Sequence, residues 1–289
     1  MFYTERFITS LVLSCAFVLT ACQSPATKNS TIDTPDVAEY GSITDAAAGT
    51  TLTASQLITR LSDAPMVIVG EEHTNLQHHH IEQWLLENLA KRRPQGSVLM
   101  EMIDVSQQDG VNRVKQASLS DTPVSASRAA ETLRWNSGWP WEMYRGVVMT
   151  AIEGRYPLLA ANLSRQQVKA LYQNPTFPRG EHASRPQVHE ALSAIIFLMH
   201  GGQIESEQVN AMMAIQQHRD RFMAEQLRRA PRPALLIAGG YHASKDIGVP
   251  LHLADLQAGK PMVLILTTDG TSLTAKQADY VWSVPAVKR

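Results

Sequence analysis

Five short, continuous apolar runs constrain the fold of this chain more than any other feature. They lie at residues 66–69, 98–100, 158–161, 234–238 and 262–266. Runs without alternating polar residues are typical of strands that are buried on both faces, as in a parallel sheet. Helical periodicity fills the stretches between them, at about 77–92, 126–134, 141–153 and 164–173. This order predicts an α/β fold, a mostly parallel sheet flanked by helices and joined by right-handed crossovers.

One connection is much longer than the others. It runs from the end of the third apolar run to the start of the fourth, and it carries helical patterns near 187–200 and 205–229. Prolines stand before and after these two patterns, at positions where helices start or stop. We therefore expect a helical subdomain, inserted into the α/β domain at about residues 176–232.

The N-terminus has the pattern of an export signal. A mostly apolar stretch at 7–19 ends in Leu19-Thr20-Ala21-Cys22, and it is too short for a comfortable membrane span. The Leu-x-small-Cys pattern resembles the bacterial lipobox, in which the cysteine is acylated. We expect a signal peptide at 1–21, an anchor with palmitate at Cys22, a flexible tether at 22–50 and a folded domain at 51–289. An ordinary signal peptide with a chance cysteine is the alternative.

Localisation and partners follow in part from the same region. Gln23 stands where an aspartate would retain a bacterial lipoprotein at the inner membrane, which favours the outer membrane, facing the periplasm. Removal of Cys15 and acylation of Cys22 would leave no thiol for a disulfide, so stability must come from the core. The net charge of −1 gives no sign of a nucleic-acid partner.

Polar side chains gather where four of the predicted strands end. Gly70-Glu71-Glu72-His73 follows the first run, and Gly239-Gly240-Tyr241-His242 follows the fourth. Ligands of open α/β sheets bind beyond the carboxyl ends of the strands. A single histidine after a strand is more often structural, but two Gly-x-x-His elements are harder to explain by chance. The candidate strand-edge site consists of Glu71, His73, Glu101, Asn162 and His242.

These motifs resemble a known superfamily, which contains Tiki proteins, erythromycin esterases and the ChaN haem-binding lipoproteins. Within it the sequence is most similar to the ChaN family over about residues 52–268. The resemblance rests on both Gly-x-x-His elements and on these further segments: His78-His79-His80 with Gln83, Glu101-Met102, Trp141-x-x-Tyr144, the segment from Ala160 to Arg165, and the segment from Gln216 to Ala224. ChaN proteins commonly have aspartate after the first motif's histidine, where this chain has Thr74.

The resemblance implies a function in haem and iron acquisition or storage at the outer membrane, beside a haem transporter. It also implies a homodimer that encloses two stacked haems, and haem itself could induce this dimer. Each iron would be bound by a tyrosine, and the propionates would be held by a basic residue and by a histidine of the partner. No metal other than haem iron is implied.

Tyrosine can bind haem iron, and six tyrosines remain after residue 21. Tyr144 is the first candidate, because it lies in a patch rich in aromatic residues and methionine; a core aromatic on helix 141–153 is the other interpretation. Tyr172, before the insert, is the second candidate. Arg179 and His182 in the loop of the insert are candidates for the propionates.

Four further polar residues are candidates for supporting roles. His79 and His80 lie in the first turn of a predicted helix, where they contact a propionate or metal, or are simply solvated. Gln216 and Asp220 share a helical stripe with apolar residues. Because burying them unpaired would cost roughly 1–3 kcal/mol each, we expect them to bond across to the α/β domain.

Two other functions compete with haem binding. A hydrolase could use Glu71, His73, Glu101 and His242, either to hold a divalent ion that activates water or as direct acid–base groups. No Gly-x-Ser-x-Gly element follows a strand, which argues against a serine nucleophile. Alternatively, the polar edge stabilises only the fold or a partner interface. Of these, a non-enzymatic haem protein is favoured.

Overall fold

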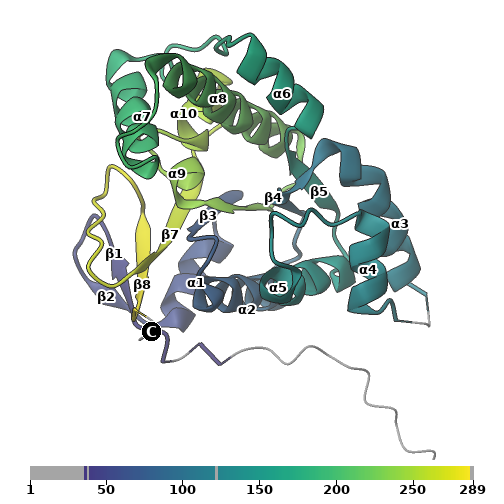
Figure 1. Ribbon diagram of the computed structural model, residues 1–289. Helices are drawn as coiled ribbons and strands as arrows, with labels where there is room; N and C mark the ends of the chain where they lie inside the picture. The colour runs from purple at the N-terminus through teal and green to yellow at the C-terminus, as the bar shows by residue number, and fades with distance from the viewer. Residues whose placement is uncertain (1–35, 38, 121–122, 287–289) are drawn as a thin grey trace, which may run out of the picture. The chain divides into compact units, whose positions relative to one another are not determined.

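A computed structural model describes residues 36–37, 39–120 and 123–286. Its centre is a sheet in the order β2-β1-β8-β7-β3-β6-β4-β5 (Figure 1). Six neighbouring strands of this sheet are parallel: β8 (Tyr280–Val284), β7 (Met262–Thr268), β3 (Met66–Glu71), β6 (Ala234–Gly239), β4 (Ser97–Asp104) and β5 (Leu158–Asn162). The predicted α/β class and its five strands are confirmed.

Two short strands close one edge of the sheet. β1 (Ser42–Asp45) pairs antiparallel with β8, and β2 (Thr51–Leu52) pairs antiparallel with β1. Val37 and Ile43 are buried there. The folded part therefore begins earlier than the boundary at residue 51 that composition predicts, because apolar residues within the polar segment pack on the core of the domain. The predicted signal peptide, Cys22 and the tether up to residue 35 lie outside the described residues.

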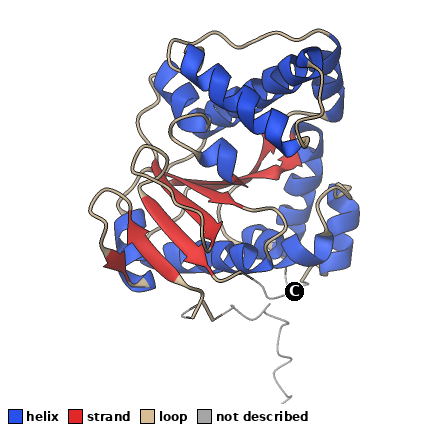
Figure 2. Cartoon of the chain, turned by 60° about the vertical axis from the view of Figure 1, so that its left-hand side comes forward, coloured by secondary structure: helices blue, strands red, loops and turns tan. Residues whose placement is uncertain are grey.

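Helices cover both faces of the sheet (Figure 2). One face carries α1 (Ala54–Ser62), α2 (Leu76–Arg92), α3 (Gln108–Ser118), α4 (Ala126–Leu133) and α5 (Trp141–Glu153), with the 3-10 helix η1 (Val105–Gln107) before α3. Successive residues of each strand point to opposite faces. Val67 and Val69 of β3 therefore pack with Leu85 of α2, whereas Met66 and Ile68 belong to the core on the other side.

The second face is covered by α8 (Ser206–Arg229), α9 (Gly240–Ala243) and α10 (Val249–Asp255). Met223 and Leu227 of α8 pack there with Leu236 of β6 and Leu253 of α10. The predicted insert corresponds to α7 (Pro186–Met199) and α8, which follow α6 (Arg165–Gln173). α7 and the first half of α8 form a third, smaller core together with Ile247, which precedes α10. The helix α8 thus connects this small core to the sheet.

None of the helices among the described residues is long and apolar enough to cross a membrane.

Candidate functional site

The carboxyl ends of β3, β6, β4 and β5 lie next to one another in the sheet. Glu71, Gly239 and Asn162 are the last residues of β3, β6 and β5, and Glu101 lies in the second half of β4. All four are buried or nearly so. Parallel strands thus bring side chains that are far apart in the sequence to one edge, as the apolar runs predict.

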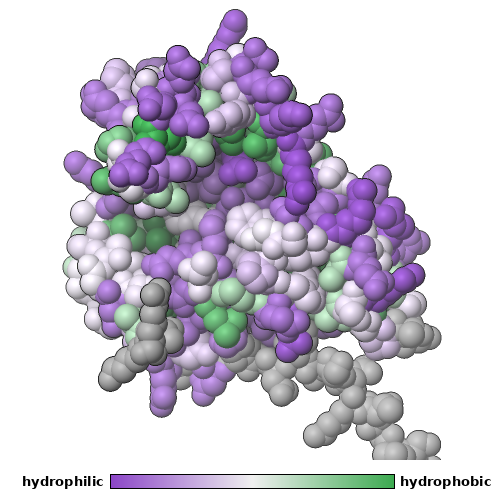
Figure 3. Space-filling model, in the orientation of Figure 1, coloured by the Kyte–Doolittle hydropathy of each residue, from purple (hydrophilic) through white to green (hydrophobic). Residues whose placement is uncertain are grey.

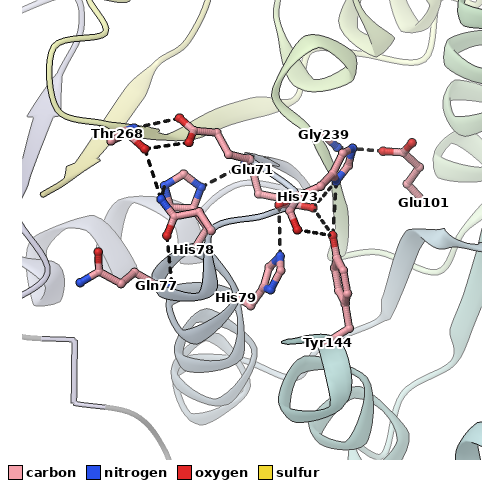
Figure 4. Close-up of polar contacts among 11 residues, drawn as sticks. Glu71, His73, Gln77, His78, His79, Glu101, Tyr144, Gly239 and Thr268 are labelled. Carbon is pink, nitrogen blue, oxygen red and sulfur yellow. Dashed lines mark hydrogen bonds and ion pairs between the residues drawn. The ribbon is translucent and has the colours of Figure 1, made fainter. Parts of the chain in front are cut away.

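Glu71 is the centre of a first polar group (Figure 4). One carboxylate oxygen accepts hydrogen bonds from Nδ1 of His73 at 2.6 Å and from the Tyr144 hydroxyl at 2.9 Å. The other oxygen accepts from Nε2 of His79 at 3.2 Å. β3 supplies the carboxylate, α2 supplies His79 and α5 supplies Tyr144. Glu71 is 2% exposed, so these donors replace the water that an ionised carboxylate would otherwise need.

The hydrogen bonds of this group control its protonation. Burial alone would raise the pKa of Glu71, but the bonds from His73 and His79 outweigh it and hold that pKa below its usual value. Burial alone would lower the pKa of His73, but the bond to Glu71 and the charge of Glu101 raise it. Burial and the negative charge of Glu71 strongly raise the pKa of Tyr144. Glu71 is therefore an anion, and Tyr144 is a neutral donor to it.

His242 is the centre of a second group. Its Nδ1 lies 2.5 Å from Asp220 of α8, and its Nε2 lies 3.3 Å from Glu101 of β4. The Gln216 amide lies 3.0 Å from Nδ1. Gln216 and Asp220 therefore do reach across from the apolar stripe of α8 to the α/β domain.

Two carboxylates keep His242 charged. Burial would lower the pKa of this imidazole, but Glu101 and Asp220 raise it to about 10. Burial raises the pKa of Asp220 to about 6, against the opposing effect of His242. The pKa of Glu101 lies well below its usual value, because His242 outweighs its burial. At neutral pH the group is an imidazolium between carboxylates.

Glu101 connects the two groups. It accepts the backbone N–H of Gly239 at 2.8 Å, and its charge acts on both His73 and His242. A side chain at Gly239 would bring its Cβ to 2.8 Å from Nε2 of His73, so glycine makes room for that ring. Asn162, at the end of β5, donates its side-chain N–H to the Glu101 carbonyl of β4 at 3.0 Å. The edge is thus one connected polar array.

A pocket of ≈ 380 Å³ opens above this array, within the roughly 300–1,000 Å³ of small-molecule sites. Figure 3 shows this face hollowed below α8. Its wall combines apolar side chains with cations. The apolar ones are Met102, Trp139, Leu163, Val168 and Ile215, and the cationic ones are Arg165, Lys169 and Arg219. Glu101 and Asn162 lie at the same pocket.

The two tyrosine candidates differ in exposure. Tyr144 is fully buried and donates to Glu71, so an iron ion cannot reach it in this conformation. Tyr172 is 43% exposed and lines the pocket. It also lines a neighbouring cavity of ≈ 610 Å³ between α6 and the start of α8. Tyr172 lies in the last turn of α6, a helix whose N-terminus is capped by Ser164, because its hydroxyl accepts the N–H of Gln167.

Other candidates lie outside the pocket. His80 contacts the hydroxyl of Tyr40 at 2.9 Å rather than the strand edge. His182 contacts Asp255 at 2.9 Å, and neither His182 nor Arg179 lines either cavity. Lys169 and Arg219 were not singled out from the sequence. The sequence shows only that each lies on a helix. Whether that helical position faces the carboxyl ends of the strands depends on how α6 and α8 pack.

Among the described residues, no group of three or more His, Cys, Asp and Glu side chains is arranged to hold a metal ion.

The family comparison covers most of this fold. Residues 57–253 match the family described as haem-binding uptake, Tiki superfamily, ChaN. The chain belongs to this family. No curated protein matches the chain. The ChaN structure from Campylobacter jejuni, described as binding haem cofacially, is 26% identical, with a TM-score of 0.76 over 84% of this chain and 96% of that one.

Two more distant structures are also similar to this ChaN-family chain. The type III effector HopBA1 is 12% identical, with a TM-score of 0.47, over 87% of this chain and 99% of that one. The erythromycin esterase EreC in its open conformation is 13% identical, with a TM-score of 0.43, over 76% and 74%. The ChaN family is a haem-binding family, so the predicted relationship and the predicted cofactor class, haem, are confirmed.

Proposed function

We propose that this chain binds haem in the strand-edge pocket and acts in haem uptake or storage. The observation that carries the proposal is the composition of the pocket wall. Haem is a flat apolar ring with two carboxylates and an iron, and the wall offers an apolar surface, three cations and a half-exposed tyrosine in one cavity. The chain's membership of a haem-binding family supports the same ligand.

The pocket residues divide the tasks of holding haem. Trp139 and Ile215 would pack on the ring, and Arg165, Lys169 and Arg219 would pair with the propionates, since cations bind carboxylates by charge-assisted hydrogen bonds. The haem supplies the iron centre. Tyr172 is the protein ligand for it, because tyrosine is an established haem ligand and this one is accessible.

Replacing Tyr172 with phenylalanine tests the ligand. In wild-type protein with hemin, we expect the charge-transfer band of a ferric phenolate, and Tyr172→Phe should abolish it. Tyr241→Phe is the matched control, because Tyr241 is 50% exposed but lines neither cavity. An unchanged spectrum in Tyr172→Phe would refute this ligand, and loss of the band only in Tyr144→Phe would return the role to Tyr144.

A homodimer with cofacial haems is the second part of the proposal. The Campylobacter jejuni relative binds haem cofacially, and in this chain Tyr172 lies between two open cavities, where a second haem and a partner could cover it. Sedimentation of the protein with and without hemin tests this. We expect a dimer when hemin is bound, and a monomer in both states would refute stacked haems.

We further propose that Cys22 is acylated and holds the domain at the outer membrane, close to a haem transporter. The lipobox pattern and Gln23 support this. Cells fed with labelled palmitate should label the wild type but not Cys22→Ser, and the labelled protein should fractionate with the outer membrane. Labelling of Cys22→Ser, or recovery in the inner membrane, would contradict the proposal.

In intact cells, crosslinking should join the wild type, but not Cys22→Ser, to an outer-membrane transporter. Absence of that crosslinked product would contradict the proposed partner.

Acid–base hydrolysis is a second candidate, favoured by one observation. Two carboxylate–imidazole groups, at His73 and His242, lie next to Glu101, which lines the pocket. Positioned imidazoles with carboxylate partners can transfer protons to a reacting group. A panel of activated esters and amides would test it: hydrolysis that His73→Ala abolishes would support an enzyme, and rates equal to buffer would eliminate it.

A further inference from the structure

The side chain of Glu82 on α2 is a buried acid without a partner. It is 0% exposed, and no described residue forms a hydrogen bond with either carboxyl oxygen. An ionised carboxylate without partners would be very costly to bury, so such a group keeps its proton. Burial, with the negative charge of Glu71, raises the pKa of Glu82 well above its usual value. A protonated carboxyl has one O–H that needs an acceptor.

His79, one helical turn before Glu82, has a buried ring nitrogen that needs a hydrogen-bond donor. Its Nε2 donates to Glu71 at 3.2 Å, which places a proton on that nitrogen. In a neutral imidazole the other nitrogen is then an acceptor. This Nδ1 is buried, and none of the described residues bonds to it. Residues three apart on a helix face each other, so the donor without an acceptor and the acceptor without a donor are neighbours.

We propose that Glu82 is a neutral acid whose O–H is donated to Nδ1 of His79 through one bridging water molecule. This bond fixes the tautomer of His79 that donates to Glu71. Through Glu71 it also fixes His73, whose side chain is 37% exposed beside the pocket residue Trp139. Glu82 is thus a positioning residue at the buried end of a chain of hydrogen bonds that runs through His79 and Glu71 to His73.

The surroundings of Glu82 favour the neutral form. The Glu71 carboxylate from β3 disfavours a second negative charge on Glu82, and the Tyr144 hydroxyl from α5 already donates to Glu71. His79 remains as the acceptor on α2 itself. This chain of hydrogen bonds does not involve haem, so the inference would remain valid if the proposed function failed.

Two substitutions in the full-length protein separate this role from simple packing. Glu82→Gln keeps an N–H donor for Nδ1 of His79, whereas Glu82→Leu removes it. Glu131→Gln, on α4, is the control, because the side chain of Glu131 is 70% exposed. Infrared spectra at pH 7 should show the C=O stretch of a buried neutral carboxyl. We expect Glu82→Gln to remove this band and Glu131→Gln to leave it.

Nitrogen-15 NMR of the histidines tests the consequence. His79 should carry its proton on Nε2 in the wild type and in Glu82→Gln, and should populate the other tautomer in Glu82→Leu. The pKa of His73 should stay unchanged in Glu82→Gln and fall by roughly half a unit or more in Glu82→Leu, as its bond to Glu71 loosens. The absence of a neutral carboxyl band, its persistence in Glu82→Gln, or unchanged histidine spectra in Glu82→Leu would overturn the proposal. If Glu82→Leu does not fold, the infrared comparison with Glu82→Gln decides alone.

Discussion

His242 shows how much a single residue in this site depends on its neighbours. It is a buried imidazolium whose charge is balanced by Asp220 and Glu101, in a region that would otherwise exclude it. Removing one partner of a buried ion pair leaves the other charge uncompensated. The stability of the whole domain is therefore coupled to the site at this residue.

Asp220→Ala tests that coupling. We expect it to lower the free energy of unfolding by roughly 3–5 kcal/mol, because His242 loses its shortest contact. Glu225→Ala on the same helix removes the partially exposed pair with Arg221 and should cost about 1 kcal/mol or less. Urea unfolding of both variants measures the difference, and equal losses would show that Asp220 does not stabilise a buried charge.

Two buried histidines predict acid sensitivity. Burial lowers the pKa of both His78 and His252 to about 4, below the value of about 6.5 in an unfolded chain. Between these values the unfolded chain binds more protons, so stability falls as pH decreases from about 6.5 to about 4. Each histidine contributes a loss on the order of 3 kcal/mol at pH 4.

Comparing wild type with His252→Leu isolates one of these histidines. The carboxylates of the site also titrate in acid, but they do so in both proteins. Urea midpoints measured from pH 7.5 to pH 4 should therefore fall less steeply in His252→Leu. Parallel curves for the two proteins would contradict the assignment.

Two strand-end glycines have different roles in positioning the elements. A Cβ at Gly70 would lie 2.6 Å from the Ala243 Cβ and 3.0 Å from the Gly240 Cα, so α9 itself would have to move away from β3. A Cβ at Gly239 would meet only the end of the His73 side chain and, at 3.6 Å, Glu101. One glycine therefore allows α9 to approach the sheet, and the other makes room for a site residue.

Gly70→Ala should destabilise the protein by roughly 1–3 kcal/mol, as overpacking of a buried contact does. Gly239→Ala should cost less than that, since one side chain can shift, but it should move the NMR signals of His73. Thermal unfolding and histidine spectra of both variants check this. A larger stability loss in Gly239→Ala than in Gly70→Ala would contradict the distinction.

The sequence predicted the elements that are continuous and apolar. β3, β6 and β7 are buried on both faces, and their runs cannot be mistaken for surface strands. β8 was missed although its residues are mostly apolar and buried. β1 was missed because it lies in a polar segment near the edge of the sheet and gains its burial only by pairing. Local pattern does not contain information of that kind.

The site, too, could be predicted where it depends on local sequence pattern, but not where it depends on contacts between distant elements. Glu71, His73, Glu101 and His242 could be placed at one edge because each lies at, near or just after the end of a strand. The bonds of Tyr144 to Glu71 and of Asp220 to His242 join elements distant in the sequence, and so does the approach of Arg219 to the pocket. These contacts depend on how α5 and α8 pack. Helical periodicity predicts which face of a helix is buried, but it does not predict which element that face packs against.

At the scale of the whole molecule, the sheet and the α6–α8 region together form the pocket that we propose binds haem. α6 brings Lys169 and Tyr172, α8 brings Ile215 and Arg219, and the strand ends bring the polar floor. Neither part forms the pocket alone. Because Arg165 and Lys169 of this pocket are exposed, we expect haem affinity to fall as salt increases.

Hemin titration of wild type, Lys169→Glu and Lys276→Glu, followed by the Soret band, tests the central claim most directly. Lys169 lines the pocket, whereas Lys276 is an exposed lysine that does not line it. We predict saturable binding to the wild type, an affinity for hemin at least about tenfold weaker in Lys169→Glu, because a charge-assisted contact becomes repulsive, and no change in Lys276→Glu. Binding no better than to an unrelated control protein, or equal affinities of all three proteins, would contradict haem binding in this pocket.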